Sequence, residues 1–322
     1  MTPQPGSRAV GSTPAVAAIE FLQGLRAGLE AGLAPEAAAE LAAAALPESV
    51  RKPVRGVLAR LRGDNHEDEW GFDEELAETA YPVFELLYER WWRVRCTGVG
   101  HVPSHGRAML VANHAGSLLP FDAAMITTAL MKEHPLPRWP RFMALDWAFA
   151  APFLGPFIRK VGGVPANHAN ATRILDADEL LMTFPEGAKG SGKRYSERYQ
   201  VQRFGRGGFV EIALRTGTPI VPVAVIGAEE TYPMIADAAP LARLLGAPFA
   251  PITPTFPWLG PLGLVPLPSR WRIEFCAPVD LSPYPPEAAE DRRLVLDLSE
   301  AVREKVAGAV RENLLERGPA FG

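Results

Sequence analysis

Several features that would narrow the class of this protein are scarce in its 322 residues. Only two cysteines occur, Cys96 and Cys276, and neither has CxxC or Cys/His spacing, so neither a disulfide framework nor a zinc site is predicted. No run of about eighteen uncharged apolar residues is free of proline, so no transmembrane helix is predicted. Residues 1–13 lack the apolar segment of a secretory signal.

A strong excess of one charge is also missing. The chain has 33 Lys and Arg against 37 Asp and Glu, a formal net charge of −4. Proteins that bind nucleic acid usually carry a basic footprint, so no nucleic-acid partner is predicted. The 48% hydrophobic content is typical of a globular protein. Contact with a membrane would therefore depend mainly on apolar surface, helped by local basic clusters.

The first part of the chain predicts helices. We expect residues 1–13 to be disordered. Residues 14–92 are expected to form a helical N-terminal region, because an Ala-rich stretch has apolar residues at helical spacing, and Gly and Pro divide it into short helices. A further helix is predicted from about Asp73 to Trp92. Such an appended region would serve as a lid, a packing element or a membrane-surface element.

Residues 93–322 predict a different organisation. Short apolar strands alternate with helices, which is typical of an α/β domain with a mostly parallel sheet flanked by helices. A last helix, about Pro286–Arg317, carries one apolar stripe. The predicted strands are Val94–Thr97, Ala108–Ala112, Phe142–Leu145, Leu180–Phe184, Ile220–Ile226 and Trp271–Cys276, and the helices between them are about Asp122–Lys132, Ala169–Leu175 and Gly208–Thr216.

A histidine and an aspartate stand where such a sheet places its sites. His114 follows the predicted strand Ala108–Ala112, and the carboxyl ends of parallel strands are where open α/β sheets bind ligands. Asp122 falls in the first turn of the next helix, after Pro120. A carboxylate beside a histidine fixes its tautomer and stabilises its charged form. The pair is predicted to act as a general base on a hydroxyl; taken alone, a helix cap and a packed histidine would explain it as well.

A second motif, Phe-Pro-Glu-Gly at 184–187, ends another predicted strand. A proline, a carboxylate and glycines at a strand exit form a tight turn with open backbone amides. Lys189 and Lys193 add positive charge that suits a phosphate. Glu186 is placed to accept a hydrogen bond from a glycerol hydroxyl, although an ordinary polar turn is an equal alternative for the motif alone.

With both motifs in this order, and a Val-Pro strand at 220–224, the chain resembles the glycerolipid acyltransferase family, which includes the lysophosphatidate acyltransferases. The resemblance covers roughly residues 93–280 and implies a glycerol-3-phosphate acyltransferase-like fold. It also implies transfer of a fatty acyl group to a lipid hydroxyl, such as that of a lysophospholipid, from acyl-CoA or acyl carrier protein. By the same resemblance His114 is the base, Asp122 its partner, and Glu186 and Gly187 bind the acceptor.

The reaction so implied needs no metal and no cofactor beyond the acyl thioester. The expected partners are the lipid acceptor, the thioester donor and a membrane surface, with the protein peripheral at the cytoplasmic face of a membrane.

Two features depart from the family pattern. Seven residues separate His114 from Asp122 where the family has four, so the connection must bulge for the pair to meet. In the block that should carry an arginine, His168 stands instead, and a histidine is a poor replacement for a bidentate guanidinium. Arg173, Arg159 or Lys160 are the candidates to compensate. Without one of them, a neutral acceptor such as a mono- or diacylglycerol, or a catalytically silent lipid-binding protein, is the alternative.

The segment from Leu244 to Ser269 has no charged residue and seven prolines. So many prolines forbid a membrane-spanning helix. A long irregular loop packed on the core is one interpretation. The other is a segment that dips into the membrane interface or lines the acyl-chain channel, because Phe256 and Trp258 suit the headgroup boundary.

Overall fold

The computed structural model describes most of the chain, in seven stretches. The disorder predicted for residues 1–13 lies outside them. The described residues are 14–46, 51, 67–116, 119, 121–151, 154–244 and 246–321.

The chain divides into two compact units, which are considered separately. The first comprises Met1–Glu69 and Asp73–Ala80, and the second comprises Trp70–Phe72 and Tyr81–Gly322. The division lies before the expected boundary at residue 93. The physical reason is that Tyr88 and Trp92 are buried in the core of the second unit, so the end of the predicted helix Asp73–Trp92 belongs there.

In the first unit, helices α1 (Pro14–Glu30) and α2 (Pro35–Ala44) pack against each other. A side chain on Gly28 would come within 2.8 Å of the Ala38 Cβ, so glycine and alanine allow the two backbones to approach closely. Two of the helices predicted for this part of the chain are therefore present, whereas residues 47–50 and 52–66 lie outside the described residues.

The second unit is built on a seven-stranded sheet with the order β1-β9-β6-β2-β5-β3-β4. The five strands from β6 to β4 are parallel, whereas β9 runs antiparallel to β6 and parallel to β1. The predicted fold class, α/β with a mostly parallel sheet, is confirmed. The strands are β1 (Arg95–Thr97), β2 (Ala108–Ala112), β3 (Arg141–Ala144), β4 (Gly163–Pro165), β5 (Leu180–Thr183), β6 (Ile220–Ile226) and β9 (Arg272–Phe275).

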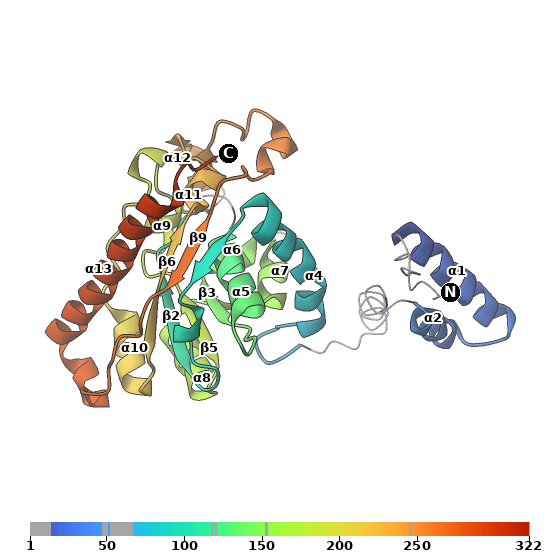
Figure 1. Cartoon of the computed structure of the whole chain (residues 1–322), viewed down its shortest axis with the longest axis horizontal. Helices are drawn as coiled ribbons and strands as arrows, with labels where there is room; N and C mark the ends of the chain where they lie inside the picture. Colours follow the sequence, from blue (N-terminus) through green and yellow to red (C-terminus); the bar gives the residue numbers. More distant parts are fainter. Residues whose placement is uncertain are drawn as a thin grey trace, which may run out of the picture. The chain divides into compact units, whose positions relative to one another are not determined.

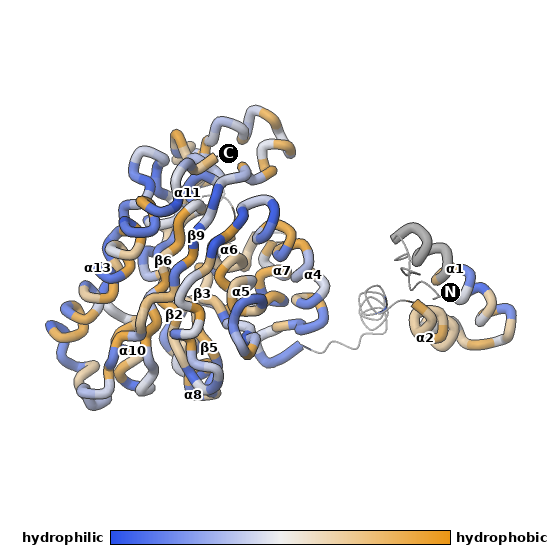
Figure 2. The backbone as a smooth tube through the Cα atoms, viewed as in Figure 1, coloured by the Kyte–Doolittle hydropathy of each residue, from blue (hydrophilic) through white to orange (hydrophobic). Residues whose placement is uncertain are grey.

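Helices cover both faces of this sheet, which explains why every residue of β2 and β6 is buried. Along β2, Ala108, Leu110 and Ala112 face one apolar core and Met109 and Val111 face the other. Figure 2 shows these strands as hydrophobic segments in the middle of the unit. The first core contains α5 (Phe121–Glu133), α6 (Asp146–Ala150) and α7 (Leu154–Lys160), and the second contains α8 (His168–Asp176), α10 (Gly208–Thr216) and α13 (Arg292–Arg317).

The predicted last helix is in fact two elements. Asp291 interrupts it, and its carboxylate accepts hydrogen bonds from the amides of Arg293 and Leu294, which caps α13. Strand β4 was not predicted, because Gly163-Val164-Pro165 reads as a turn; it lies at the sheet edge, where proline is tolerated.

The remaining elements are short or peripheral, apart from α4. Among the helices that the structure describes, none combines the length and apolarity needed to cross a membrane. These elements are α4 (Glu74–Leu86), η1 (Leu87–Trp91), η2 (Val99–His101), α9 (Ala188–Ser191), η3 (Tyr195–Glu197), α11 (Ala228–Thr231), β7 (Ala236–Asp237), α12 (Ala239–Leu244), β8 (Pro251–Ile252), η4 (Gly260–Leu264) and η5 (Pro286–Glu290).

Candidate active site

His114 and Asp122 are in direct contact at the carboxyl edge of the sheet. The Nδ1 atom of His114 lies 2.6 Å from Oδ2 of Asp122. His114 follows β2 by two residues, and Asp122 lies in the first turn of α5. A carboxylate can only accept, so the imidazole donates through Nδ1 and keeps Nε2 for another partner.

Two described features lie in the long connection between the two residues. Gly116 has a φ of +94°, a conformation that favours glycine, and the amide of Phe121 donates to the carbonyl of Leu119 at the start of α5. The carboxylate of Asp122 is itself fixed by the amides of Ala115 at 3.0 Å and Ala123 at 2.9 Å. Its fully buried charge is thereby compensated, and the start of a helix favours it further.

The Glu186 carboxylate supports the backbone of the same loop. Its Oε1 accepts from the amide of His114 at 2.8 Å, and its Oε2 accepts from the amide of Gln202 at 2.7 Å. The side chain has no exposed surface. This arrangement differs from the acceptor-binding role expected for Glu186, because both of its oxygens are used within the protein.

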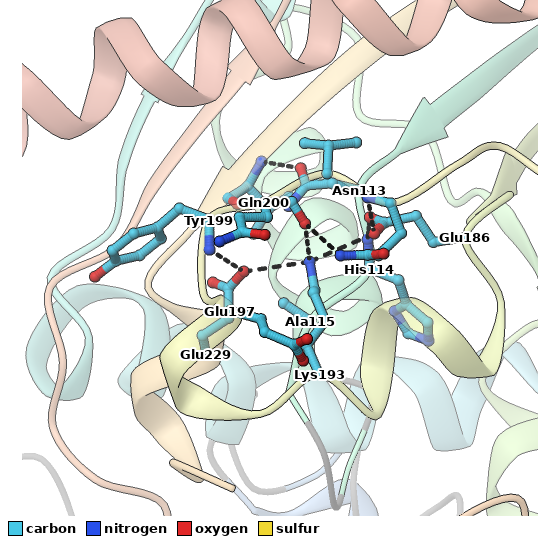
Figure 3. Close-up of polar contacts among 12 residues, drawn as sticks. Asn113, His114, Ala115, Glu186, Lys193, Glu197, Tyr199, Gln200 and Glu229 are labelled. Carbon is cyan, nitrogen blue, oxygen red and sulfur yellow. Dashed lines mark hydrogen bonds and ion pairs between the residues drawn. The ribbon is translucent and has the colours of Figure 1, made fainter.

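Lys193 lies next to Glu186 inside the protein (Figure 3). Its Nζ is 3.4 Å from Oε2 of Glu186 and 3.6 Å from Oε1 of Glu229, and it donates to the carbonyl of Gln200. Only 3% of its side chain is exposed. Lys193 was expected to bind a phosphate, but its ammonium group is committed to two buried carboxylates. Burial raises the pKa of Glu229, and the charge of Lys193 opposes that rise.

Glycines allow these side chains to approach the loop. A Cβ on Gly190 would lie 2.6 Å from the Glu186 Cβ and 2.9 Å from the His114 Cβ, which leaves no space for any other residue. Gly187 has a φ of +57° and a ψ of −146°, a combination suited to glycine alone. The motif thus brings helix α9 against His114.

Asn113 fixes the other side of the loop. Its side chain donates to the carbonyl of Val225 and accepts from the amide of Val225, both at 2.8 Å. The loop that carries His114 is therefore joined to β6 as well as to Glu186. No role was predicted for this asparagine from the sequence, although its place directly before His114 was a usable signal.

An apolar cavity opens beside the His114 ring. The Phe184 ring packs on the imidazole with centroids 4.5 Å apart. Among the described residues that line the cavity, His114 is the only ionisable one, and the others include Phe142, Ala148, Leu154, Ile158 and Phe249. The uncharged segment therefore contributes Phe249 to this cavity.

The electrostatic setting suits a base. Burial lowers the pKa of His114, but the Asp122 and Glu186 carboxylates together raise it more. The pKa thus lies above its ordinary value of 6.5. Charged imidazole is favoured by this environment, which is what a group that receives a proton during a reaction requires.

Of the predicted substrate-binding residues, all of which the structure describes, Gly187 alone lines this cavity. Lys189 is exposed on α9. Arg173 is exposed on α8, with its guanidinium 4.6 Å from the centre of the Trp70 ring. His168 is exposed at the start of α8 and lies 3.9 Å from Glu211. In the part of the chain that the structure describes, no group of three His, Cys, Asp or Glu side chains is arranged to hold a metal ion.

Comparison with known proteins gives a consistent result. Residues 93–226 match the family model described as Acyltransferase. An uncharacterised protein of Mycobacterium bovis is 46% identical over 270 residues, which are 83% of this chain and 75% of that protein. The chloroplastic phytyl ester synthase 2 of Arabidopsis thaliana is 26% identical over 146 residues, 42% of this chain and 20% of that protein.

The fold also has a solved counterpart. The crystal structure of the 1-acyl-sn-glycerophosphate acyltransferase PlsC from Thermotoga maritima superimposes with a TM-score of 0.50 at 21% identity, over 82% of this chain and 91% of that one. At this level of identity the likeness shows a shared fold.

Proposed function

The chain belongs to the acyltransferase family, and we propose on that basis that it moves a fatty acyl group from a thioester, acyl-CoA or acyl carrier protein, to a hydroxyl of a glycerolipid such as a lysophospholipid. The observation that carries this proposal is the contact of His114 with Asp122 beside an apolar cavity. A long acyl chain needs an apolar site, and a hydroxyl acceptor needs a base at its end.

The proposed mechanism uses Nε2 of His114 as the base. It takes the proton of the acceptor hydroxyl while the oxygen attacks the thioester carbonyl carbon, and Asp122 stabilises the imidazolium. The tetrahedral intermediate then collapses, the C–S bond breaks, and the imidazolium returns the proton to the thiolate. An ester and a free thiol result. Base catalysis supplies roughly 10²–10⁴-fold in rate, and alignment of two bound substrates supplies much of the rest.

In this proposal, Glu186 and Lys193 position the base instead of contacting the acceptor. The hydrogen bond from the His114 amide to Glu186 holds the loop, and Lys193 balances the buried charge. Gly187 lines the cavity and remains a candidate for acceptor binding through its backbone. Lys189, which follows the Phe-Pro-Glu-Gly motif, remains the candidate for an acceptor phosphate.

A neutral acceptor is the second candidate, and a specific observation favours it. No lysine or arginine occurs among the described residues that line the cavity at His114. The family's arginine position is occupied by His168, which is exposed and outside this cavity. A mono- or diacylglycerol would need no cation there.

Thiol release from acyl-CoA, measured with a panel of lysophospholipids and acylglycerols, tests the proposal. Release that depends on a lysophospholipid supports the first candidate, and release that depends on an acylglycerol supports the second. No release with any acceptor or with an acyl carrier protein donor would contradict both. We further propose that the reaction takes place at the cytoplasmic face of a membrane, with the protein bound peripherally.

A further inference from the structure

A second cavity of the same unit is lined almost entirely by arginines. Its volume is about 230 Å³, many times the roughly 10–15 Å³ that a single water requires. Five separate arginines meet there although they come from three distant parts of the sequence. The lining residues are Arg93, Arg95, Arg270, Trp271, Arg272 and Arg317.

The positive charge of this arginine cavity is only partly balanced. Arg272 pairs with Glu316, and Arg317 pairs with Glu230. Arg93 and Arg95 have no carboxylate partner among the residues that the structure describes. The electrostatic potentials of several positive charges on a concave surface add together and attract an anion.

Arg317 provides an independent sign of a ligand. Only 5% of its side chain is exposed, and its Nε is buried with no hydrogen-bond partner among the described residues. A buried guanidinium N–H normally has an acceptor.

The backbone of Arg93 is a second sign. Arg93 has a φ of +47°, which is unusual for a residue other than glycine, and strained residues of this kind cluster where ligands bind.

Arg93 connects this cavity to the uncharged segment 244–269. The Trp91 indole donates to the carbonyl of Pro266, and the Arg93 guanidinium donates to the carbonyl of Pro268, so both are attached to the uncharged segment. In that segment Leu262 is 71% and Val265 49% exposed. A cluster of guanidinium groups bonded to a segment with exposed aliphatic side chains matches the headgroup region of a bilayer, where phosphates adjoin acyl chains.

The location relates this cavity to the active site. In the register of the sheet, Arg272 of β9 lies opposite Ile226 at the end of β6, and Arg95 of β1 lies opposite Arg272. These arginines are therefore at the same sheet edge as His114. Two to three strand spacings separate β2 from β9 and β1, which is about 10–15 Å. The phosphate and free hydroxyl of one lysophospholipid are only about 5 Å apart from covalent geometry. A phosphate in the arginine cavity therefore belongs to a molecule other than the acceptor at His114.

We propose that the arginine cavity binds the phosphate of an anionic membrane phospholipid and thereby holds the active-site edge of the sheet against the bilayer. This inference rests on the proposed function in one respect, because a lipid acceptor brings the protein to a membrane. It adds a defined lipid-binding site, separate from the substrates.

The test compares binding to vesicles of phosphatidylcholine with and without phosphatidylglycerol. The Arg93→Glu/Arg95→Glu variant should lose at least tenfold in affinity for the anionic vesicles. Arg215 is exposed on α10, so the control variant Arg215→Glu should bind vesicles like the wild type. A second control, Arg93→Lys/Arg95→Lys, keeps the positive charge and should bind within a few fold of the wild type. Thermal unfolding of each variant verifies folding. Unchanged vesicle binding by the folded double glutamate variant would overturn the proposal.

Two further arms identify the source of the phosphate. Calorimetry with inorganic phosphate and with adenosine 3′,5′-bisphosphate, the phosphate-bearing part of CoA, measures binding of free anions. A lipid site would be overturned if the wild type bound either anion at micromolar concentration, and the double glutamate variant lost that binding but still bound vesicles like the wild type. Vesicle binding needs no acyl donor, so a wild-type protein that binds vesicles through these arginines but releases no thiol would contradict only the proposed function.

Discussion

The amide of His114 donates a hydrogen bond to the Glu186 carboxylate, with 2.8 Å between nitrogen and Oε1. Two motifs separated by some seventy residues in sequence are thus joined at the backbone of the candidate base. The ring of His114 is fixed at its other end by Asp122. The position of the imidazole is therefore set by two carboxylates, one acting on its main chain and one on its side chain.

Replacing Lys193 should lower the stability of the fold. Lys193→Met leaves Glu186 and Glu229 buried without their cation, which should lower the free energy of unfolding by about 3–5 kcal/mol. Adding Glu229→Gln removes one of the two uncompensated charges and should recover part of that loss. Urea unfolding of the single and double variants measures this coupling. Equal stability of the Lys193→Met variant and the wild type would show that the cluster has no structural role.

Gly190→Ala should damage the site by a steric effect alone. The new Cβ would lie 2.6 Å from the Glu186 Cβ and 2.9 Å from the His114 Cβ, and neither atom can swing aside. Overpacking of this kind costs roughly 1–3 kcal/mol, and the displaced base should reduce kcat at least tenfold. Gly308→Ala in α13 meets only the end of Arg311 and is the matched control, with full activity expected. Full activity of Gly190→Ala would contradict the close packing of α9 on His114.

The pH dependence of acyl transfer should report the raised pKa of His114. Burial lowers this pKa, but Asp122 and Glu186 raise it more, so the imidazole stays protonated to a higher pH than an ordinary histidine. Because the base must be neutral, kcat/KM should rise with pH through an inflection above 6.5. Asp122→Asn removes the main cause of the rise, so its inflection should move to lower pH while its rate falls by roughly 10²–10⁴-fold. An inflection that does not move would exclude Asp122 as the partner.

The cavity beside His114 should determine which acyl chains are used. Ala148 lines it and is buried, so Ala148→Phe fills space that a long chain would occupy. The kcat/KM for a long-chain acyl-CoA should fall at least tenfold relative to that for a short-chain donor. Ala169→Phe, at an exposed position of α8, should leave this ratio unchanged. If both variants keep the wild-type ratio, the acyl chain lies elsewhere.

The sequence was most informative where physical constraints are local. Strands β2 and β6 begin and end where they were predicted, since a continuous apolar run bounded by polar or glycine residues has few other interpretations. The contact of His114 with Asp122 was expected despite the long connection between them, and the structure contains this contact. The predicted resemblance to an acyltransferase family is confirmed by the family model that matches residues 93–226, and the predicted fold class is confirmed by the sheet.

Long-range pairings could not be predicted in the same way. Lys193 reads as a surface cation, because its partner Glu229 lies thirty-six residues further along and only the fold brings the two together. The arginine cavity depends on the pairing of β1 with β9. A weak signal existed, since two arginines stand two residues apart at the start of each of these strands, Arg93 with Arg95 and Arg270 with Arg272.

The most direct test of the account is thiol release from acyl-CoA by the His114→Ala variant, measured with the acceptor that the wild type uses. We predict a loss of at least about 100-fold in rate, as expected when a general base is removed, with a thermal unfolding midpoint near that of the wild type. A folded His114→Ala protein that releases thiol at the wild-type rate would contradict the assignment of His114 as the base.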